Sequence, residues 1–186
     1  MILLLALGAG LVVGLGWAKW SGKPYCPPEL KYSWLAFIAF LPQFFSIYYE
    51  RTTVLFPDWV VAFAIIISQG LLFLFAWLNR HILGMPILIG GLVLNLTVMI
   101  ANGGFMPINP ITAERLVGSE RMAFFELGSR IGYKDVLLSS GETRLEFLAD
   151  RFLPPTGFPY QVAFSLGDVF IGLGAFWILA FQKPIA

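Results

Sequence analysis

The sequence predicts an all-α fold: a polytopic membrane helix bundle with about five transmembrane helices and short amphipathic helices in a long external segment. Two observations favour this class. Hydrophobic residues make up 58% of the 186 residues and charged residues only 12%, well below the roughly 25% charged share of a soluble domain. Long apolar stretches also recur along the chain between short connections that contain Pro, Gly and charged residues. We therefore treat residues 1–186 as a single integral membrane domain.

A spanning helix needs about 20 mostly apolar residues. The stretches that reach or approach this length are Ile2–Ala18, Ser33–Tyr49, Trp59–Leu78, Leu83–Ala101 and Val162–Gln182. The first has no basic region before it and no A-x-A-like cleavage site, so we expect a retained helix rather than a cleaved leader. Pro24 and Pro57 lie in the connections, where helices are expected to stop.

Lysine and arginine are unequally divided between the two sets of short loops. One set contains Lys19, Lys23, Lys31, Arg80 and Lys183, and the other contains only Arg51. The positive-inside rule places the first set in the cytoplasm. The N-terminus and the segment 102–161 are then external, and the C-terminus is cytoplasmic.

The external segment 102–161 has helix patterns of its own. Asn109 and Pro110 form a good helix start, with Asn as N-cap and Pro at the first helical position. A second candidate helix spans about 142–152, because Leu145, Leu148 and Phe152 fall on one helical face. We expect these helices to cap the bundle or to lie on the membrane surface.

One acidic residue, Asp168, lies within the last apolar stretch. Acids inside spanning helices are rare and commonly functional. Counting inward from the external boundary places Asp168, Asn95 and Gln43 at one depth, roughly 9 Å below the interface. These three side chains, with Asn102 nearby, are expected to form a polar intramembrane layer. The layer serves either as a small pocket that opens outward or as hydrogen-bonded contacts that fix helix packing.

A buried Asp168 needs a partner or a proton. Among the cations of the external segment, Arg144 and Arg151 are the best candidates to reach it. Otherwise Asp168 is protonated, or it accepts hydrogen bonds from Asn95, Asn102 or backbone N–H groups.

Several classes of function lack support in the sequence. The net charge of +1 and the absence of a basic run give no reason to expect nucleic acid. One Cys and one His argue against an all-protein zinc site. The serines lack a paired His, and no P-loop, dinucleotide fingerprint or H-E-x-x-H motif occurs. We therefore expect no catalytic residues, no metal and no resident cofactor.

Several blocks of the chain resemble those of an uncharacterised family of small bacterial multi-pass membrane proteins, a domain-of-unknown-function family. The blocks are 101–107, 134–138, 142–150 and 164–169. This resemblance covers nearly the whole chain and implies the bacterial cytoplasmic (inner) membrane. A fainter resemblance, at Gly90-Gly91 with Asn95 and at 164–168, is to the C-terminal half of lipoprotein signal peptidases. That family implies an aspartate pair, which is incomplete here because no acid follows Asn95 within the span.

The expected function is a non-enzymatic accessory or structural subunit of a larger membrane assembly, such as a respiratory or photosynthetic electron-transfer complex. Its partners are the lipid bilayer and other membrane subunits, and its aromatic surface suits contact with bound lipid, quinone or pigment. The alternative is a small-molecule or lipid-handling protein with an outward-facing pocket around Asp168. In that alternative, hydrolysis would need a second acid from the external segment.

Overall fold

The computed structural model describes residues 2–48, 56–155, 157–158 and 161–181, without the side chains of 43 and 45–48. Its apolar helices are α1 (Ile2–Ser21), α2 (Ser33–Tyr48), α4 (Asp58–Leu78), α5 (Met85–Ala101) and α8 (Leu166–Ala180). All five apolar stretches therefore form helices. Within the described part of the chain, only α1 and α4 have both the length and the hydropathy of a membrane-spanning helix, and the other three are shorter.

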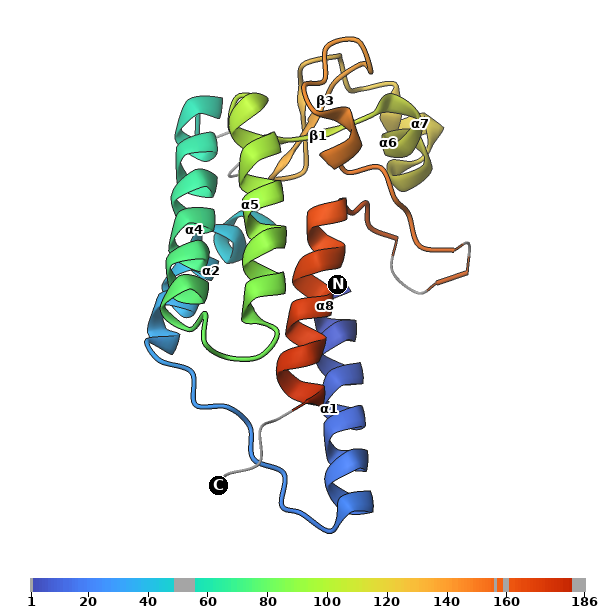
Figure 1. The fold of residues 1–186 in the computed structure, drawn as a ribbon. Coiled ribbons are helices and arrows are strands. Elements are labelled where there is room, and N and C mark those ends of the chain that lie inside the picture. The colour runs from blue at the N-terminus through green and yellow to red at the C-terminus, as the bar shows by residue number, and fades with distance from the viewer. Residues whose placement is uncertain (1, 49–55, 156, 159–160, 182–186) are drawn as a thin grey trace.

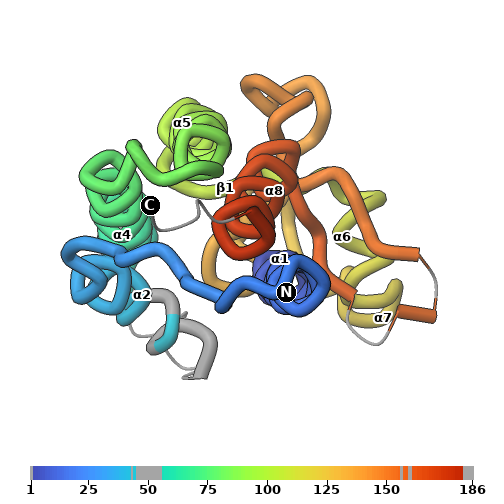
Figure 2. The backbone as a smooth tube through the Cα atoms, turned by 60° about the horizontal axis from the view of Figure 1, so that its bottom comes forward, coloured from blue at the N-terminus to red at the C-terminus, as the bar shows by residue number. Residues whose placement is uncertain are grey.

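The apolar helices pack side by side in the order α2, α4, α5, α8, α1. Figures 1 and 2 show that this row is curved, with α1 and α2 at its two ends although they are neighbours in the sequence. Asn79, at the C-terminal end of α4, holds the α1–α2 connection in place. Its side chain accepts a hydrogen bond from the Lys31 backbone N–H at 2.8 Å and donates one to the Lys31 carbonyl at 2.9 Å.

Glycines bring α5 and α8 into backbone contact. A Cβ added to Gly91 on α5 would lie 2.5 Å from the carbonyl oxygen of Gly167 on α8, closer than real Cβ atoms approach. Close approach through small residues is a common way for apolar helices to associate, because it brings many atoms into van der Waals contact. The α5–α8 pair is therefore closely packed beside the polar residues described below.

The segment between α5 and α8 contains a small sheet, so the expectation of an all-α fold is wrong there. Its strands are β1 (Met106–Ile108), β2 (Arg130–Ile131) and β3 (Asp135–Leu137), in the order β1-β3-β2. β1 pairs parallel with β3, in the register Met106 to Asp135, and β2 pairs antiparallel with β3. Strands this short carry almost no sequence pattern, and their pairing depends on contacts between distant parts of the chain.

The helices of this segment agree only in part with those predicted from the sequence. α6 (Pro110–Val117) begins where expected, with the Asn109 side chain accepting a hydrogen bond from the Ile111 N–H at 2.9 Å. It is followed by α7 (Ser119–Met122). The helix expected over 142–152 is wrong, because only the 3₁₀ turn η1 (Glu146–Leu148) forms there. Leu145 has a φ of 57°, a left-handed conformation that interrupts any α-helix through this position.

The sheet-containing segment packs against one end of the bundle, as Figure 1 shows. Phe105, Met106, Val136 and Leu148 are buried in one apolar cluster with residues of α4 and α5. The bundle residues of this cluster are Val61, Ala62, Ile65, Val98 and Met99. We refer to residues 102–161 as the cap, since they cover this end of the helices.

Candidate functional site

α8 begins at Leu166, four residues later than the apolar stretch suggests. Phe152 and Phe164 form a β-bridge that keeps the chain before Ser165 extended, and Ser165 is the N-cap. Asp168 is therefore in the first turn of α8 and not six residues into the helix, as the apolar stretch predicted. This later start of α8 corrects the position within the helix that was expected for Asp168 from counting residues.

Ser165 and Asp168 form a capping box at the start of α8. The Ser165 hydroxyl accepts a hydrogen bond from the Asp168 N–H at 3.0 Å, and the Asp168 carboxylate accepts one from the Ser165 N–H at 3.1 Å. A capping box satisfies backbone donors that have no partner within the helix. A carboxylate in the first helical turn also interacts favourably with the helix dipole.

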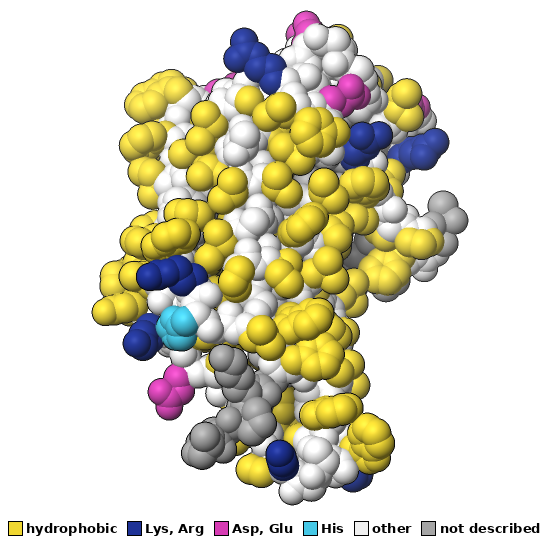
Figure 3. Space-filling model, in the orientation of Figure 1, with side chains coloured by type: hydrophobic (Ala, Val, Ile, Leu, Met, Phe, Trp, Pro, Cys, Tyr) yellow, Lys and Arg dark blue, Asp and Glu magenta, His cyan; other side chains and the backbone are white. Residues whose placement is uncertain are grey.

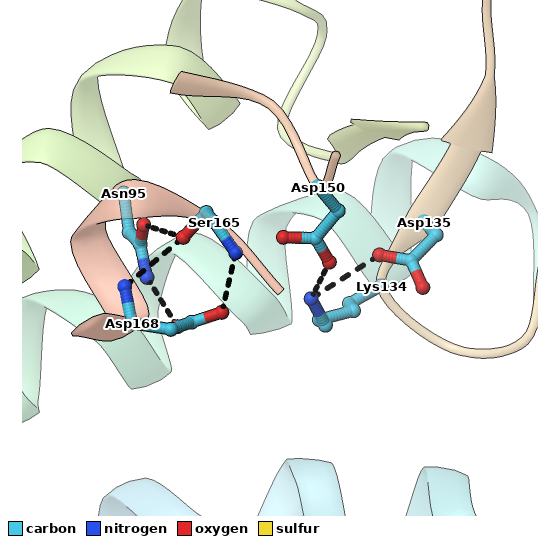
Figure 4. Close-up of polar contacts among 6 residues, drawn as sticks. All are labelled: Asn95, Lys134, Asp135, Asp150, Ser165 and Asp168. Carbon is cyan, nitrogen blue, oxygen red and sulfur yellow. Dashed lines mark hydrogen bonds and ion pairs between the residues drawn. The ribbon is translucent and has the colours of Figure 1, made fainter. Parts of the chain in front are cut away.

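Asn95 of α5 completes this polar group, as Figure 4 shows. Its amide donates to Asp168 Oδ1 at 2.8 Å, and its carbonyl oxygen accepts from the Ser165 hydroxyl at 2.7 Å. Asn95 and Ser165 are buried, whereas Asp168 is partly exposed. A Cβ at Gly167 would collide with Asn95 Oδ1, so the glycine makes room for the amide. The group joins α5 to α8.

Asn102, which was also expected in the polar layer, lies elsewhere. The Asn102 amide donates to the carbonyls of Val98 and Arg144, and its oxygen accepts from the Arg144 N–H at 2.9 Å. Asn102 therefore links the end of α5 to the cap and does not contact Asp168. The side chain of Gln43 is outside the described residues.

The expected cap cations do not reach Asp168 either. The Arg144 guanidinium donates to the Ala101 carbonyl at 3.4 Å, and the Arg151 guanidinium lies 5.8 Å from the ring centroid of Phe152. Over the described ranges, neither forms an ion pair. A different cap residue, Lys134, brings a positive charge to this end of the bundle.

Lys134, Asp135 and Asp150 form an ionic cluster beside the capping box, and Figure 4 shows the two groups next to each other. The Lys134 ammonium pairs with the fully buried Asp150 carboxylate and lies 3.3 Å from Asp135 Oδ1. Among the described residues, the second oxygen of Asp150, Oδ1, has no hydrogen-bond donor. The Lys134 side chain keeps 25% of its surface exposed.

No pattern in the sequence predicts this cluster. Lys134 and Asp150 are 16 residues apart in an irregular part of the chain, so no helical or strand spacing brings them together. The backbone pairing of Ile108 with Asp150, and of β1 with β3, places them side by side. Ser165 was detectable from the S-x-x-D spacing of a capping box.

Burial and charge shift the titration of these groups. Burial raises the pKa of Asp150 to about 8, although the Lys134 ammonium opposes the shift. Burial also raises the pKa of Asp135 and of the Tyr133 phenol. Burial lowers the pKa of Lys134, but Asp135, Asp150 and Asp168 outweigh this effect and raise it well above its ordinary value. The cluster thus keeps a charged lysine and holds a proton on a buried carboxyl group near neutral pH.

This arrangement can hold charge and a proton, but it has little capacity for nucleophilic chemistry. The Ser165 hydroxyl donates to an amide oxygen rather than to a base. No group of three or more His, Cys, Asp or Glu side chains suited to a metal ion occurs in the described part of the molecule.

Comparison with known proteins gives one match. The model of a family of unknown function, DUF5317, matches residues 28–180. No curated protein and no solved structure matches the chain. The match agrees with the resemblance to an uncharacterised family, while the resemblance to lipoprotein signal peptidases is not shown.

Proposed function

The chain belongs to the DUF5317 family of unknown function, and we propose that it is a non-enzymatic integral membrane protein that acts as an accessory or structural subunit of a larger membrane assembly. The observation that carries this proposal is the apolar surface of the helix row. Figure 3 shows hydrophobic side chains gathered over the helices on the face in view. Large side chains such as Phe37, Trp59 and Phe63 are 76%, 72% and 64% exposed.

This exposure argues against a soluble core. The core helix of a soluble protein is mostly buried. By contrast, only 11% of the most apolar 18-residue stretch of α1 is buried, and only 28% of the corresponding stretch of α4. In α1 the buried residues are Gly10 and Gly14, which contact α8. An apolar surface of this extent requires lipid or protein partners to cover it.

We propose that all five apolar helices cross a bacterial cytoplasmic membrane, with the cap external. α5 and α8 have 17 and 15 residues, or about 25 and 22 Å at 1.5 Å per residue. Both are shorter than the ~30 Å hydrocarbon core. Local thinning of the bilayer and the apolar part of the cap at their outer ends would compensate for the difference.

The polar groups near the outer end of the bundle support a structural role. Asp168, Asn95 and Ser165 satisfy one another, and Lys134 pairs with Asp150 and Asp135. The first group joins α5 to α8 and the second joins segments of the cap, and both leave the apolar flanks free for contact with other subunits. A respiratory or photosynthetic electron-transfer complex, with quinone or pigment tails, is the host that we propose for an aromatic surface of this kind.

The test is purification of the full-length protein from its native membrane in a mild detergent, followed by native mass spectrometry. We expect at least one other membrane protein in a fixed ratio. A second variant tests whether the apolar surface holds the partner. Replacing the exposed residues Phe37 and Phe63 with Ala should release the partner and leave the fold intact. A monomer without any partner in fixed ratio, recovered in several mild detergents, contradicts the proposal.

A second candidate function is the handling of a lipid or small molecule at an outward-facing site around Asp168. One observation favours it: Asp168 and Lys134 are both partly exposed, and Asp150 beside them has an oxygen without a donor. The cap thus supplies the second acid that a hydrolytic variant of this function would need. A lipid retained by the wild type and lost from Asp168→Asn at unchanged thermal stability would favour this candidate over the structural role.

A further inference from the structure

The cap contains a cavity that the proposed subunit role does not require. Its volume is about 250 Å³, and it lies between the start of α6 and the segment 143–151. The lining residues are Asn109, Ile111, Thr112, Thr143, Glu146, Ala149, Asp150 and Arg151. Ligand sites for drug-sized molecules measure about 300–1,000 Å³. A cavity of this size therefore suits a smaller ligand.

The walls of the cavity are held in place by hydrogen bonds. The Asn109 side chain caps α6 and also donates to the Ser140 hydroxyl at 2.9 Å. The Thr143 hydroxyl donates to the Ser139 carbonyl at 2.9 Å. The Asp150 N–H donates to the Pro107 carbonyl at 3.0 Å, while its carboxylate pairs with Lys134. A preformed site loses less entropy on binding than a flexible one.

Three charged residues line the cavity: the buried Asp150, which pairs with Lys134, and two exposed residues of opposite charge, Glu146 and Arg151. Glu146 and Arg151 are exposed, and in the described part of the chain neither takes part in an ion pair. A simple anion would face the Glu146 carboxylate, and a simple cation would face the Arg151 guanidinium. A molecule that carries both an ammonium and an anionic group satisfies both side chains. The N-terminal end of α6, at the same cavity, adds a favourable field for the anionic group.

We propose that this cavity binds a small zwitterion, with its ammonium at Glu146 and its carboxylate or phosphate at Arg151. Two sources carry this chemistry: a free amino acid and the phosphoethanolamine headgroup of a lipid. η1 contacts both α5 and α8, so the cavity lies close to the outer end of the helices. The hydroxyl groups of Thr112 and Thr143 complete a polar lining.

The test uses the full-length protein in detergent and isothermal titration calorimetry with alanine and with phosphoethanolamine. Ethanolamine and glycerol phosphate, which carry one charge sign each, are the comparison ligands. We expect at least one zwitterion to bind about tenfold or more tightly than either comparison ligand, since loss of one charge-assisted contact costs about that factor. Equal binding of a single-charge ligand, or no binding by either zwitterion, overturns the proposal.

Charge-neutral variants locate the site. Glu146→Gln and Arg151→Gln should each weaken zwitterion binding about tenfold or more. The matched controls are Glu114→Gln and Arg115→Gln, which neutralise exposed charges of α6 that do not line the cavity. These should bind as the wild type does. Equal weakening in the controls contradicts the assignment, and unchanged thermal midpoints verify that all four variants are folded.

A lipid measurement distinguishes the two sources. Nanodiscs with phosphatidylethanolamine or with phosphatidylglycerol are compared by counting the lipids that remain bound in native mass spectrometry. Preferential retention of phosphatidylethanolamine, lost in Arg151→Gln, identifies a lipid headgroup. Zwitterion binding in calorimetry without such retention identifies a free small molecule. Neither measurement requires a partner subunit. A failure of zwitterion binding can therefore be distinguished from a failure of the proposed subunit role.

Discussion

The Asn95 amide of α5 donates a hydrogen bond to Asp168 Oδ1 of α8 at 2.8 Å, and this contact links two helices that are 73 positions apart in the chain. The same carboxylate accepts from the Ser165 N–H through its other oxygen. Asp168 thus accepts donors from both helices. This one side chain therefore couples the initiation of α8 to its packing on α5.

Replacing Asp168 tests whether its role is structural. Asp168→Leu removes both acceptors and leaves the Asn95 amide and the Ser165 N–H without partners. We expect a loss of about 1–3 kcal/mol in unfolding free energy, measured by thermal or denaturant unfolding in detergent. Asp168→Asn retains one acceptor oxygen and should lose less. A loss of activity or ligand in Asp168→Asn without any loss of stability would argue for a functional role instead.

Two adjacent glycines of α5 should respond oppositely to alanine. At Gly91 the new Cβ would meet the Gly167 carbonyl oxygen at 2.5 Å, whereas at Gly90 nothing lies within 4 Å. We expect Gly91→Ala to destabilise by about 1–3 kcal/mol through overpacking. Gly90→Ala should be neutral, or stabilising by up to about 1 kcal/mol. Thermal midpoints of the two variants check this, and equal midpoints would contradict the close packing of α5 on α8.

The Lys134–Asp150 pair should contribute far more than an exposed ion pair. Above the pKa of about 8, where the Asp150 carboxyl group is ionised, Lys134→Met leaves it without its counter-charge, and removal of one partner of a buried pair costs about 3–5 kcal/mol. The comparison variant is Asp58→Asn, which breaks the pair with Arg130; the Asp58 side chain is 65% exposed. The buried Arg130 guanidinium keeps its contacts with the Phe56 carbonyl and the Phe105 ring. This variant should cost less than about 1 kcal/mol. Similar losses in the two variants would contradict the buried character of the cluster.

Stability should fall as pH rises, with a contribution from Asp150. The pKa of its carboxyl group is about 8 in the folded protein against an ordinary value of 3.8. Between these two values the folded state keeps a proton that the unfolded state has lost, so raising the pH favours unfolding. The raised pKa of Asp135 has the same sign. Unfolding measured across this window should give a shallower slope for Asp150→Asn, and an unchanged slope would refute the assignment.

The native cysteine offers a test of the proposed orientation. Cys26 lies in the α1–α2 connection, which the positive-inside rule places in the cytoplasm. A membrane-impermeant maleimide should therefore label Ser140→Cys of the cap, in a Cys26→Ala background, from outside intact cells. The wild type, with Cys26 alone, should be labelled only after the membrane is permeabilised. The reverse pattern would invert the topology.

Part of the candidate site was predictable. The meeting of Asn95 with Asp168 follows from two polar residues near the outer ends of apolar helices, where each needs a partner. Counting residues from Val162 placed Asp168 too far into the helix, because the whole apolar stretch was assumed to be helical. The Phe152–Phe164 bridge instead keeps the chain extended up to Ser165. Apolar composition alone does not distinguish a strand from the first turn of a helix.

The sequence by itself determined the apolar helices, their approximate ends and the Asn109 cap of α6. These features depend on hydropathy and hydrogen bonds between residues that are close in the chain. Only the tertiary structure decided that α1 and α2 lie at opposite ends of the row and that Lys134, rather than Arg144 or Arg151, provides the charge beside Asp168. Both outcomes depend on which distant segments pair in the cap and which glycines let helices approach. Such contacts form between residues far apart in the chain, and no local periodicity encodes them.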